Sequence, residues 1–122
     1  MDDSVTTVAE LKQIVKDFSD ARDWNRFHGA KDLAIGAVTE ASELLQEFRF
    51  KSDDEIEGMF RDTVKTKAIG DEIADTLYFL LRISQRYNID LSRELQRKMK
   101  KNEANYPLEK SRGSNKKYTE LK

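Results

Sequence analysis

Apolar residues recur every three or four positions along most of this chain, a spacing that places them on one face of an α-helix. The pattern runs from Val8 to Phe18, from Leu33 to Phe48 and from Ile69 to Tyr87. Only one Pro and five Gly, the residues least compatible with a helix interior, occur among the 122 residues. The sequence therefore predicts an all-α fold, a bundle of four or five helices.

The ends of these helices carry their own signals. The expected helices cover residues 8–21, 32–50, 67–87 and 91–104, with a weakly periodic segment from 53 to 66. Thr7 and Ser52 each stand three positions before a Glu, the pattern of a capping box. Asp90 is placed to cap the last helix and Pro107 to stop it. Residues 22–31 have no period but hold the only Trp and the only His, so we expect an ordered loop.

Composition narrows the class of protein. The 22 basic and 23 acidic residues give a net charge of −1, which argues against a nucleic-acid binder or a polybasic membrane protein. Without Cys, disulfides, thiolate zinc sites and cysteine nucleophiles are excluded. No apolar run suits a membrane span or a signal peptide, so a cytoplasmic location is expected. We expect one helical domain over residues 1–107 and a flexible basic tail over 108–122.

Two pairs of acids lie at helical spacing. Glu40 and Glu43 are three residues apart on one expected helix, and Glu72 and Asp75 are three apart on another. Side chains at this spacing share a helix face. On a helical wheel Glu72 falls within the apolar face formed by Ile69, Ile73, Leu80, Ile83 and Tyr87. Buried carboxylates that meet between helices repel one another, and a divalent cation such as Mg²⁺, or Mn²⁺ as a substitute, removes that cost.

Buried salt bridges or a di-iron centre would also place acids between helices. For salt bridges the candidate cations are Arg82 and Lys67, and neither stands beside Glu72 on the wheel. A ferritin-like di-iron site requires Glu-x-x-His motifs, whereas His28 lies outside any such motif.

A metal held only by carboxylates suits a substrate that supplies phosphate oxygens. No Walker-type loop is present, so the positive charge for a polyphosphate must come from elsewhere. The last helix and the tail offer basic residues for this role, namely Lys98, Lys101, Arg112, Lys116 and Lys117.

The four acids and the segments around them resemble one known family. The supporting segments are RDWNRFHGAKDL at 22–33, ELLQEFRFKSD at 43–53, GDEIADTLYFLLRIS at 70–84, KMKKNEANYP at 98–107 and KKYTEL at 116–121. They resemble the MazG-like all-α nucleoside triphosphate pyrophosphohydrolases, and most of all the dCTP pyrophosphatase branch. The resemblance implies Mg²⁺-dependent hydrolysis of a dNTP to dNMP and pyrophosphate, a house-cleaning role in nucleotide pools.

The resemblance also implies roles for individual residues. The metal ligands and catalytic residues would be Glu40, Glu43, Glu72 and Asp75. The base pocket would include Trp24, His28 and Phe50, with Phe79 beside it. The sugar or the phosphates of the nucleotide would contact Lys98, Asn102 and Tyr106. The tail would order over the phosphates on nucleotide binding, through Arg112, Lys116, Lys117 and Tyr118. A water would attack the α-phosphorus, and any of the four acids would serve as its general base.

Departures from the family pattern weaken the base preference. Phe50 stands where the family usually has Trp, and Phe79 where it usually has Tyr, so an indole N–H and a hydroxyl are lost. The alternative is a non-enzymatic helical interaction or antitoxin-like module, whose acids form structural salt bridges. The apolar stripes are broad for so short a chain, so we expect self-association as a homodimer or dimer of dimers.

Overall fold

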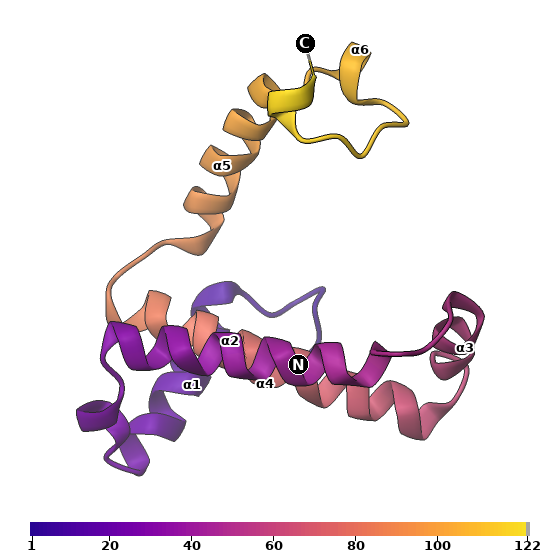
Figure 1. The fold of residues 1–122 in the computed structure, drawn as a ribbon. Helices are drawn as coiled ribbons and strands as arrows, with labels where there is room; N and C mark the ends of the chain where they lie inside the picture. Colours follow the sequence, from indigo (N-terminus) through magenta and orange to yellow (C-terminus); the bar gives the residue numbers. More distant parts are fainter. Residues whose placement is uncertain (122) are drawn as a thin grey trace. The chain divides into compact units, whose positions relative to one another are not determined.

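The structure, a computed structural model, describes residues 1–121 and is helical throughout this range apart from the connections (Figure 1). Its α-helices are α1 (Val8–Ala21), α2 (Ala30–Phe48), α3 (Asp53–Met59), α4 (Thr63–Arg86), α5 (Leu91–Asn105) and α6 (Leu108–Ser111). Two short 3₁₀ helices are η1 (Trp24–Phe27) and η2 (Tyr118–Glu120). The expected all-α fold is confirmed.

The chain forms two compact units, Met1–Asn88 and Ile89–Lys122. In the first unit α2 and α4 pack along each other, and α1 packs against α4 (Figure 1). The second unit holds α5, α6 and η2. The expected boundary between residues 107 and 108 stays a prediction.

Side-chain caps explain where the helices begin. The Thr7 hydroxyl accepts a hydrogen bond from the Glu10 N–H, and Ser52 forms the full predicted capping box with Glu55. The Asp62 carboxylate accepts from the backbone N–H groups of Val64 and Lys65, so α4 begins at Thr63, four residues earlier than expected. This cap was missed because the apolar period is weak in the first turn of α4.

Three further expectations need correction. The segment at residues 22–31 contains η1, and α2 runs from Ala30 to Phe48 rather than from 32 to 50. Phe50 has a left-handed backbone (φ 65°), which cannot continue a helix. The tail contains α6 and η2, although its composition predicted no regular structure.

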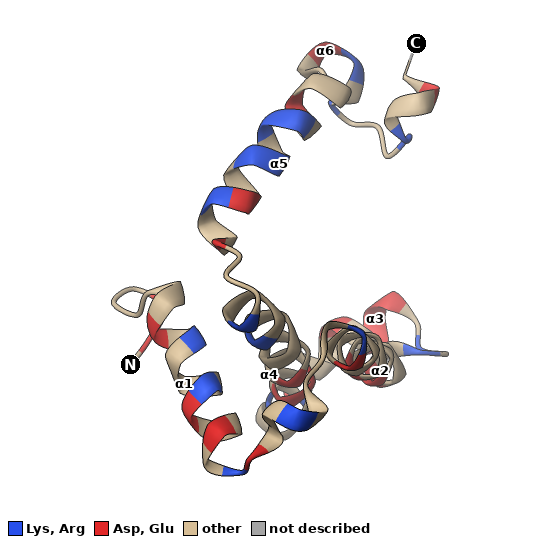
Figure 2. Ribbon diagram, turned by 90° about the vertical axis from the view of Figure 1, so that its left-hand side faces the viewer, with Lys and Arg blue, Asp and Glu red and all other residues tan. Residues whose placement is uncertain are grey.

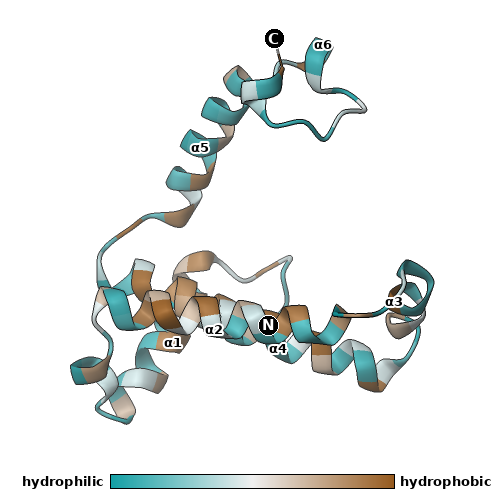
Figure 3. Cartoon of the chain, in the orientation of Figure 1, coloured by the Kyte–Doolittle hydropathy of each residue, from teal (hydrophilic) through white to brown (hydrophobic). Residues whose placement is uncertain are grey.

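The core of the first unit is small and partly polar. Its buried apolar residues are Val15, Leu33, Met59, Ile69 and Leu81. The buried face of α4 differs from the wheel, because Ile73 and Leu80 are about half exposed whereas Arg82 and Ser84 are buried. Apolar residues gather on α1, α2 and α4 (Figure 3). Within residues 1–121 no helix is long and apolar enough to cross a membrane.

Candidate functional site

Three glutamates meet where α2 and α4 pack together. One carboxylate oxygen from each of Glu40, Glu43 and Glu72 lies within 4.8 Å of the other two. Glu40 and Glu43 share a face of α2 because they are three residues apart, and Glu72 comes from the facing side of α4. Figure 2 shows acidic residues on both helices, whereas Lys and Arg predominate on α5. The packing of α2 on α4 therefore brings the predicted pairs together.

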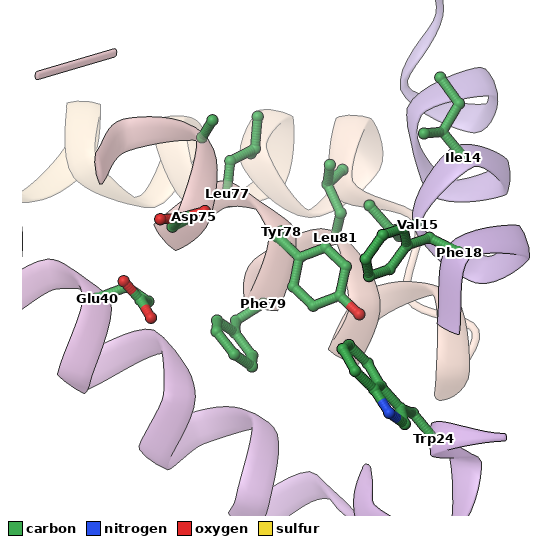
Figure 4. A pocket seen from close by; sticks show the side chains of 11 residues that line it. Ile14, Val15, Phe18, Trp24, Glu40, Asp75, Leu77, Tyr78, Phe79 and Leu81 are labelled. Carbon is green, nitrogen blue, oxygen red and sulfur yellow. The ribbon is translucent and has the colours of Figure 1, made fainter. Parts of the chain in front are cut away.

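The fourth predicted ligand, Asp75, lies one turn after Glu72 on α4. Its side chain lines a cavity together with Glu40, and the two carboxylates lie across from each other (Figure 4). Its negative charge raises the pKa of both Glu40 and Glu72, after the larger effects of burial and of Glu43. Asp75 thus belongs to the same electrostatic cluster.

The buried carboxylate oxygens of this cluster lack partners. Oε2 of Glu40 and Oε2 of Glu72 are buried and form no hydrogen bond. Burial is the main cause that raises the pKa of both carboxyls, and the neighbouring Glu43 raises it further. Unpaired buried oxygens are costly, and a hard cation is the ligand that satisfies several carboxylates at once. The residues therefore fit a divalent metal ion.

Neither a salt bridge to Glu72 nor a di-iron motif finds support at this site. The Arg82 guanidinium donates to Asn25, His28 and Gln85 instead of to Glu72. The second candidate cation, Lys67, is exposed. His28 is buried and its Nδ1 accepts a hydrogen bond from Arg82, so it does not complete a di-iron motif.

An aromatic cavity of about 570 Å³ begins beside the acids. Its wall comes from three residues of α1 (Ile14, Val15, Phe18), from Trp24 of η1, from Glu40 of α2 and from six residues of α4 (Ala74, Asp75, Leu77, Tyr78, Phe79, Leu81) (Figure 4). Glu40 and Asp75 lie on one side and Trp24 and Phe18 on the other, with Phe79 and Tyr78 between them (Figure 4). The cavity therefore joins an acidic end to an aromatic end.

The aromatic rings of this cavity pack edge to face. Ring centroids are 5.5 Å apart for Phe18 and Trp24, 6.0 Å for Phe18 and Tyr78, and 5.2 Å for Tyr78 and Phe79. A flat ligand such as a nucleobase finds here the aromatic faces and edges that favour stacking.

A second, more open cavity of about 390 Å³ shares Trp24 and Phe79 with the first. It is lined by Trp24, Phe27, His28, Asp32, Ile35, Gly36 and Phe79. The predicted base-pocket residues Trp24, His28 and Phe79 therefore do come together. Trp24 and Phe79 line both cavities.

The remaining predicted site residues belong to other segments of the chain. Phe50 is 91 % exposed after the end of α2, where the Arg49 guanidinium lies 4.5 Å from its ring centre, and it lines neither cavity. Tyr106 and Tyr118 of the second unit contact each other edge to face at 6.0 Å. The other predicted residues of that unit are Lys98, Asn102, Arg112, Lys116 and Lys117. Their roles stay predictions.

Sequence analysis missed several cavity residues. The period of Phe18 indicated only packing and no pattern singled out Tyr78, yet both residues line the larger cavity. One signal for Tyr78 was available in the sequence. Ser19 follows Val15 by four residues, so a polar side chain stands on the apolar face of α1 and needs a hydrogen-bond partner there. Its hydroxyl is buried and hydrogen-bonds the Tyr78 hydroxyl at 2.6 Å, which fixes the Tyr78 ring.

Comparison with known proteins agrees with this geometry. The chain is 34 % identical over 115 residues to dCTP pyrophosphatase 1 of Rattus norvegicus, covering 94 % of this chain and 68 % of the relative. It is 31 % identical to dCTP pyrophosphatase 1 of Homo sapiens with the same coverage. A crystal structure of a pyrophosphatase from Archaeoglobus fulgidus matches with a TM-score of 0.71 and 37 % identity, covering 81 % of this chain and 91 % of that one.

The family assignment rests on most of the chain. Residues 35–121 match the MazG-like family, and this range includes the three clustered glutamates and Asp75. The resemblance expected from the sequence is thereby confirmed, as is the helical architecture. By this match and by the acids that α2 and α4 bring together, the chain belongs to the MazG-like family.

Proposed function

We propose that this protein is a nucleoside triphosphate pyrophosphohydrolase that converts a dNTP to dNMP and pyrophosphate. One observation carries the proposal, namely that Glu40, whose unpaired carboxylate clusters with that of Glu72, also lines an aromatic cavity. The relatives named dCTP pyrophosphatase and the pyrophosphatase structure support the reaction class. The role is house-cleaning of nucleotide pools, in the cytoplasm.

Glu40, Glu43, Glu72 and Asp75 would hold the divalent cation, which we propose to be Mg²⁺, with Mn²⁺ as a substitute. Hard carboxylate oxygens are the ligands that these ions prefer. When bound, the cation neutralises negative charge on the phosphates and on the leaving pyrophosphate. A water molecule is the nucleophile. One carboxylate of the cluster accepts a proton from this water as its oxygen bonds to the α-phosphorus. The bond from the α-phosphorus to the bridging oxygen then breaks, and that oxygen leaves with pyrophosphate.

The aromatic end of the cavity would take the base. Trp24 and Phe79, which line both cavities, offer their rings for stacking, and a dCTP-like preference follows from the relatives. Phe50 lines neither cavity, so its proposed contact with the base rests on the family resemblance alone, as do the proposed sugar and phosphate contacts of Lys98, Asn102 and Tyr106.

The basic tail would cover the triphosphate. Arg112, Lys116 and Lys117 supply positive charge, and Tyr118 packs on Tyr106. If the tail orders on nucleotide, a non-hydrolysable dNTP with Mg²⁺ slows its proteolysis. Equal cleavage rates with and without nucleotide would contradict this role.

The test of the proposed function is pyrophosphate release from each of the four dNTPs, with Mg²⁺ and with a chelator. We expect turnover only with the metal, with dCTP among the substrates. Glu40→Gln and Glu72→Gln should each lower kcat/KM by roughly 10²-fold or more, because each removes a charged ligand. Glu57→Gln, at an exposed position of α3, is the matched control and should not change the rate. Full metal-dependent activity in either site variant would refute the site.

A further inference from the structure

Arg82 of α4 is a buried cation held entirely by neutral side chains. It is 1 % exposed, which makes it the largest fully buried side chain. Its Nε–H donates to Nδ1 of His28 at 3.0 Å, its Nη1 donates to Oε1 of Gln85 at 2.5 Å, and its Nη2 donates to Oδ1 of Asn25. A buried charge is expensive, so this site is shaped around the full fork of the guanidinium.

The acceptors of this fork tie η1 to α4. Asn25 belongs to η1 and His28 follows its last residue, whereas Arg82 and Gln85 both belong to α4. Asn25 extends the network, because its Nδ2 donates to the Asp20 carboxylate of α1 at 3.1 Å. We call these four residues (Asn25, His28, Arg82 and Gln85) the Arg82 clamp.

The backbone that enters η1 is strained. Asp23, directly before Trp24, has a left-handed conformation (φ 53°, ψ 41°). This conformation is uncommon for residues other than Gly, and although Asp adopts it more readily than most, contacts around the turn help to hold it. Because Asn25 and His28 follow within five residues, the clamp supplies two of the contacts that hold this turn in place.

This turn places Trp24 at the wall of both cavities. Trp24 lies between the strained Asp23 and the clamped Asn25, and packs edge to face on Phe18 at 5.5 Å and on His28 at 5.9 Å. Its exposed fraction of 36 % shows that the ring is not held by burial alone. The clamp hydrogen bonds of Asn25 and His28, the residues that follow Trp24, tie this turn to α4.

We propose that Arg82 is a positioning residue for nucleotide binding, which acts through the clamp to hold Trp24 against the aromatic cavity. The inference rests on the proposed function, since Trp24 is assigned to the base there. In this proposal His28 acts as a hydrogen-bond acceptor for Arg82. Because the guanidinium only donates, Nδ1 of His28 carries no proton, and the neutral ring has its N–H at Nε2.

The chain offers two spectroscopic probes of this proposal, because it has one Trp and one His. Wild-type protein should show a single imidazole signal of the Nε2–H form in nitrogen-15 NMR. Arg82→Met, which keeps an unbranched apolar side chain but removes every donor, should mix the tautomers. It should also shift Trp24 emission to the red and increase its quenching by acrylamide, at temperatures where circular dichroism shows full helicity.

Two more variants test whether the effect on Trp24 comes from the hydrogen bonds of Arg82, and not from its charge or from a general loss of stability. Arg82→Lys keeps the charge but not the fork, so it should behave like Arg82→Met. Arg86→Met, one turn further along α4 and outside the clamp, is the matched control and should leave Trp24 emission unchanged. If Arg82→Met does not fold, Asn25→Ala removes a single acceptor and should move Trp24 emission in the same direction.

Steady-state kinetics give the functional arm of the test. Arg82→Met should raise KM for dCTP about tenfold with a much smaller change in kcat, because binding and not chemistry is altered. Arg82→Met and Asn25→Ala together should raise KM little more than the first change alone, because they break one network. A purely structural Arg82 would lower the melting temperature but leave KM and Trp24 emission unchanged, and that result overturns the proposal. If wild-type protein hydrolyses no dNTP, the proposed function fails, whereas the two spectroscopic probes still decide whether the clamp holds Trp24.

Discussion

At the scale of single residues, this protein buries charged groups that form no ion pair within the part of the chain that the structure describes. Oε2 of Glu40 and of Glu72 lacks any hydrogen bond, and Arg82 is bound only to neutral side chains. Such groups cost stability in the folded chain and are retained where ligand binding or geometry requires them. Two predictions follow at this scale. One concerns the titration of Glu72, and the other the titration of His28, which accepts a hydrogen bond from Arg82.

The first residue-scale prediction concerns Glu72 in metal-free protein. Its pKa is raised in the folded state by burial and by Glu43, so its protonated form favours folding. That contribution is present below the ordinary carboxyl pKa and is lost as the pH rises through the folded pKa. Glu72→Gln should therefore be more stable than wild type with a chelator present, by a margin that grows with pH. Denaturant unfolding at several pH values measures this margin.

Adding Mg²⁺ gives the control for this prediction. The ion binds the folded wild-type cluster and adds stability by mass action, whereas Glu72→Gln has lost a ligand. The order of stabilities should then reverse. If Glu72→Gln is less stable than wild type at every pH with chelator, the carboxylate is not under the repulsion that we infer.

The second residue-scale prediction concerns His28. Burial lowers its pKa, the charges of Arg82 and Arg86 lower it further, and Asp32 acts in the opposite direction. A depressed pKa means that the unfolded chain binds the proton more readily, so stability is complete above the ordinary histidine pKa and is lost as the pH falls. Wild type should lose more stability than His28→Gln between about pH 7.5 and about pH 5. Parallel melting curves of the two proteins would contradict a buried neutral His28.

At the scale of elements, the contact of α2 with α4 depends on one glycine. A Cβ built on Gly36 would lie 2.4 Å from Cε1 of Phe79, so only Gly lets this ring lie against the backbone of α2. Phe79 lines both cavities, as Trp24 does. Gly36 therefore sets the position of a ring in the proposed base pocket.

The element-scale prediction compares two glycines inside helices. Gly36→Ala should destabilise the fold by about 1–3 kcal/mol, because Phe79 or α2 must move. It should also raise KM for dCTP. Gly70→Ala on α4 meets no atom within 4 Å and should instead stabilise the fold by about 0.5–1 kcal/mol. Thermal and denaturant unfolding of both variants measures these changes, and equal effects would exclude the close approach of Phe79.

At the scale of the whole molecule, the first unit leaves many apolar side chains exposed to solvent. On α2, Ile35, Val38 and Leu45 are 54 %, 71 % and 58 % exposed, and on α4 Ile73 and Leu80 are about half exposed. A broad exposed apolar surface of this kind is typical of a protein–protein interface. We propose that it meets a second copy of the chain, as a homodimer or a dimer of dimers.

The whole-molecule prediction tests this self-association. Light scattering at micromolar concentration should give at least twice the mass of one chain. Val38→Lys should shift the protein to monomer, since burying an unpaired ammonium in an apolar interface is costly. Val5→Lys, at a 70 % exposed position before α1, is the control and should leave the mass unchanged. A monomeric wild type would end the proposal.

The sequence by itself determined the helices and the choice of acids. Local signals are enough for both, because a period of three to four residues and caps such as Ser52 act within one or two turns. The same spacing put Glu40 beside Glu43 and Glu72 beside Asp75, and the place of Glu72 on the apolar face then indicated a divalent cation, which the family resemblance also implies. Errors at this level, such as the start of α4 at Thr63, arose where the apolar period was weak.

Only the tertiary structure decided which residues from different helices meet. The contact of Glu72 with the α2 glutamates, the approach of Phe79 to Gly36 and the bonds of Arg82 to η1 join residues that are far apart in the sequence. No local pattern encodes such contacts, because they depend on how α1, α2 and α4 pack. The wheel even placed Leu80 inside and did not foresee buried Arg82, since burial is set by the neighbouring elements and not by the helix itself.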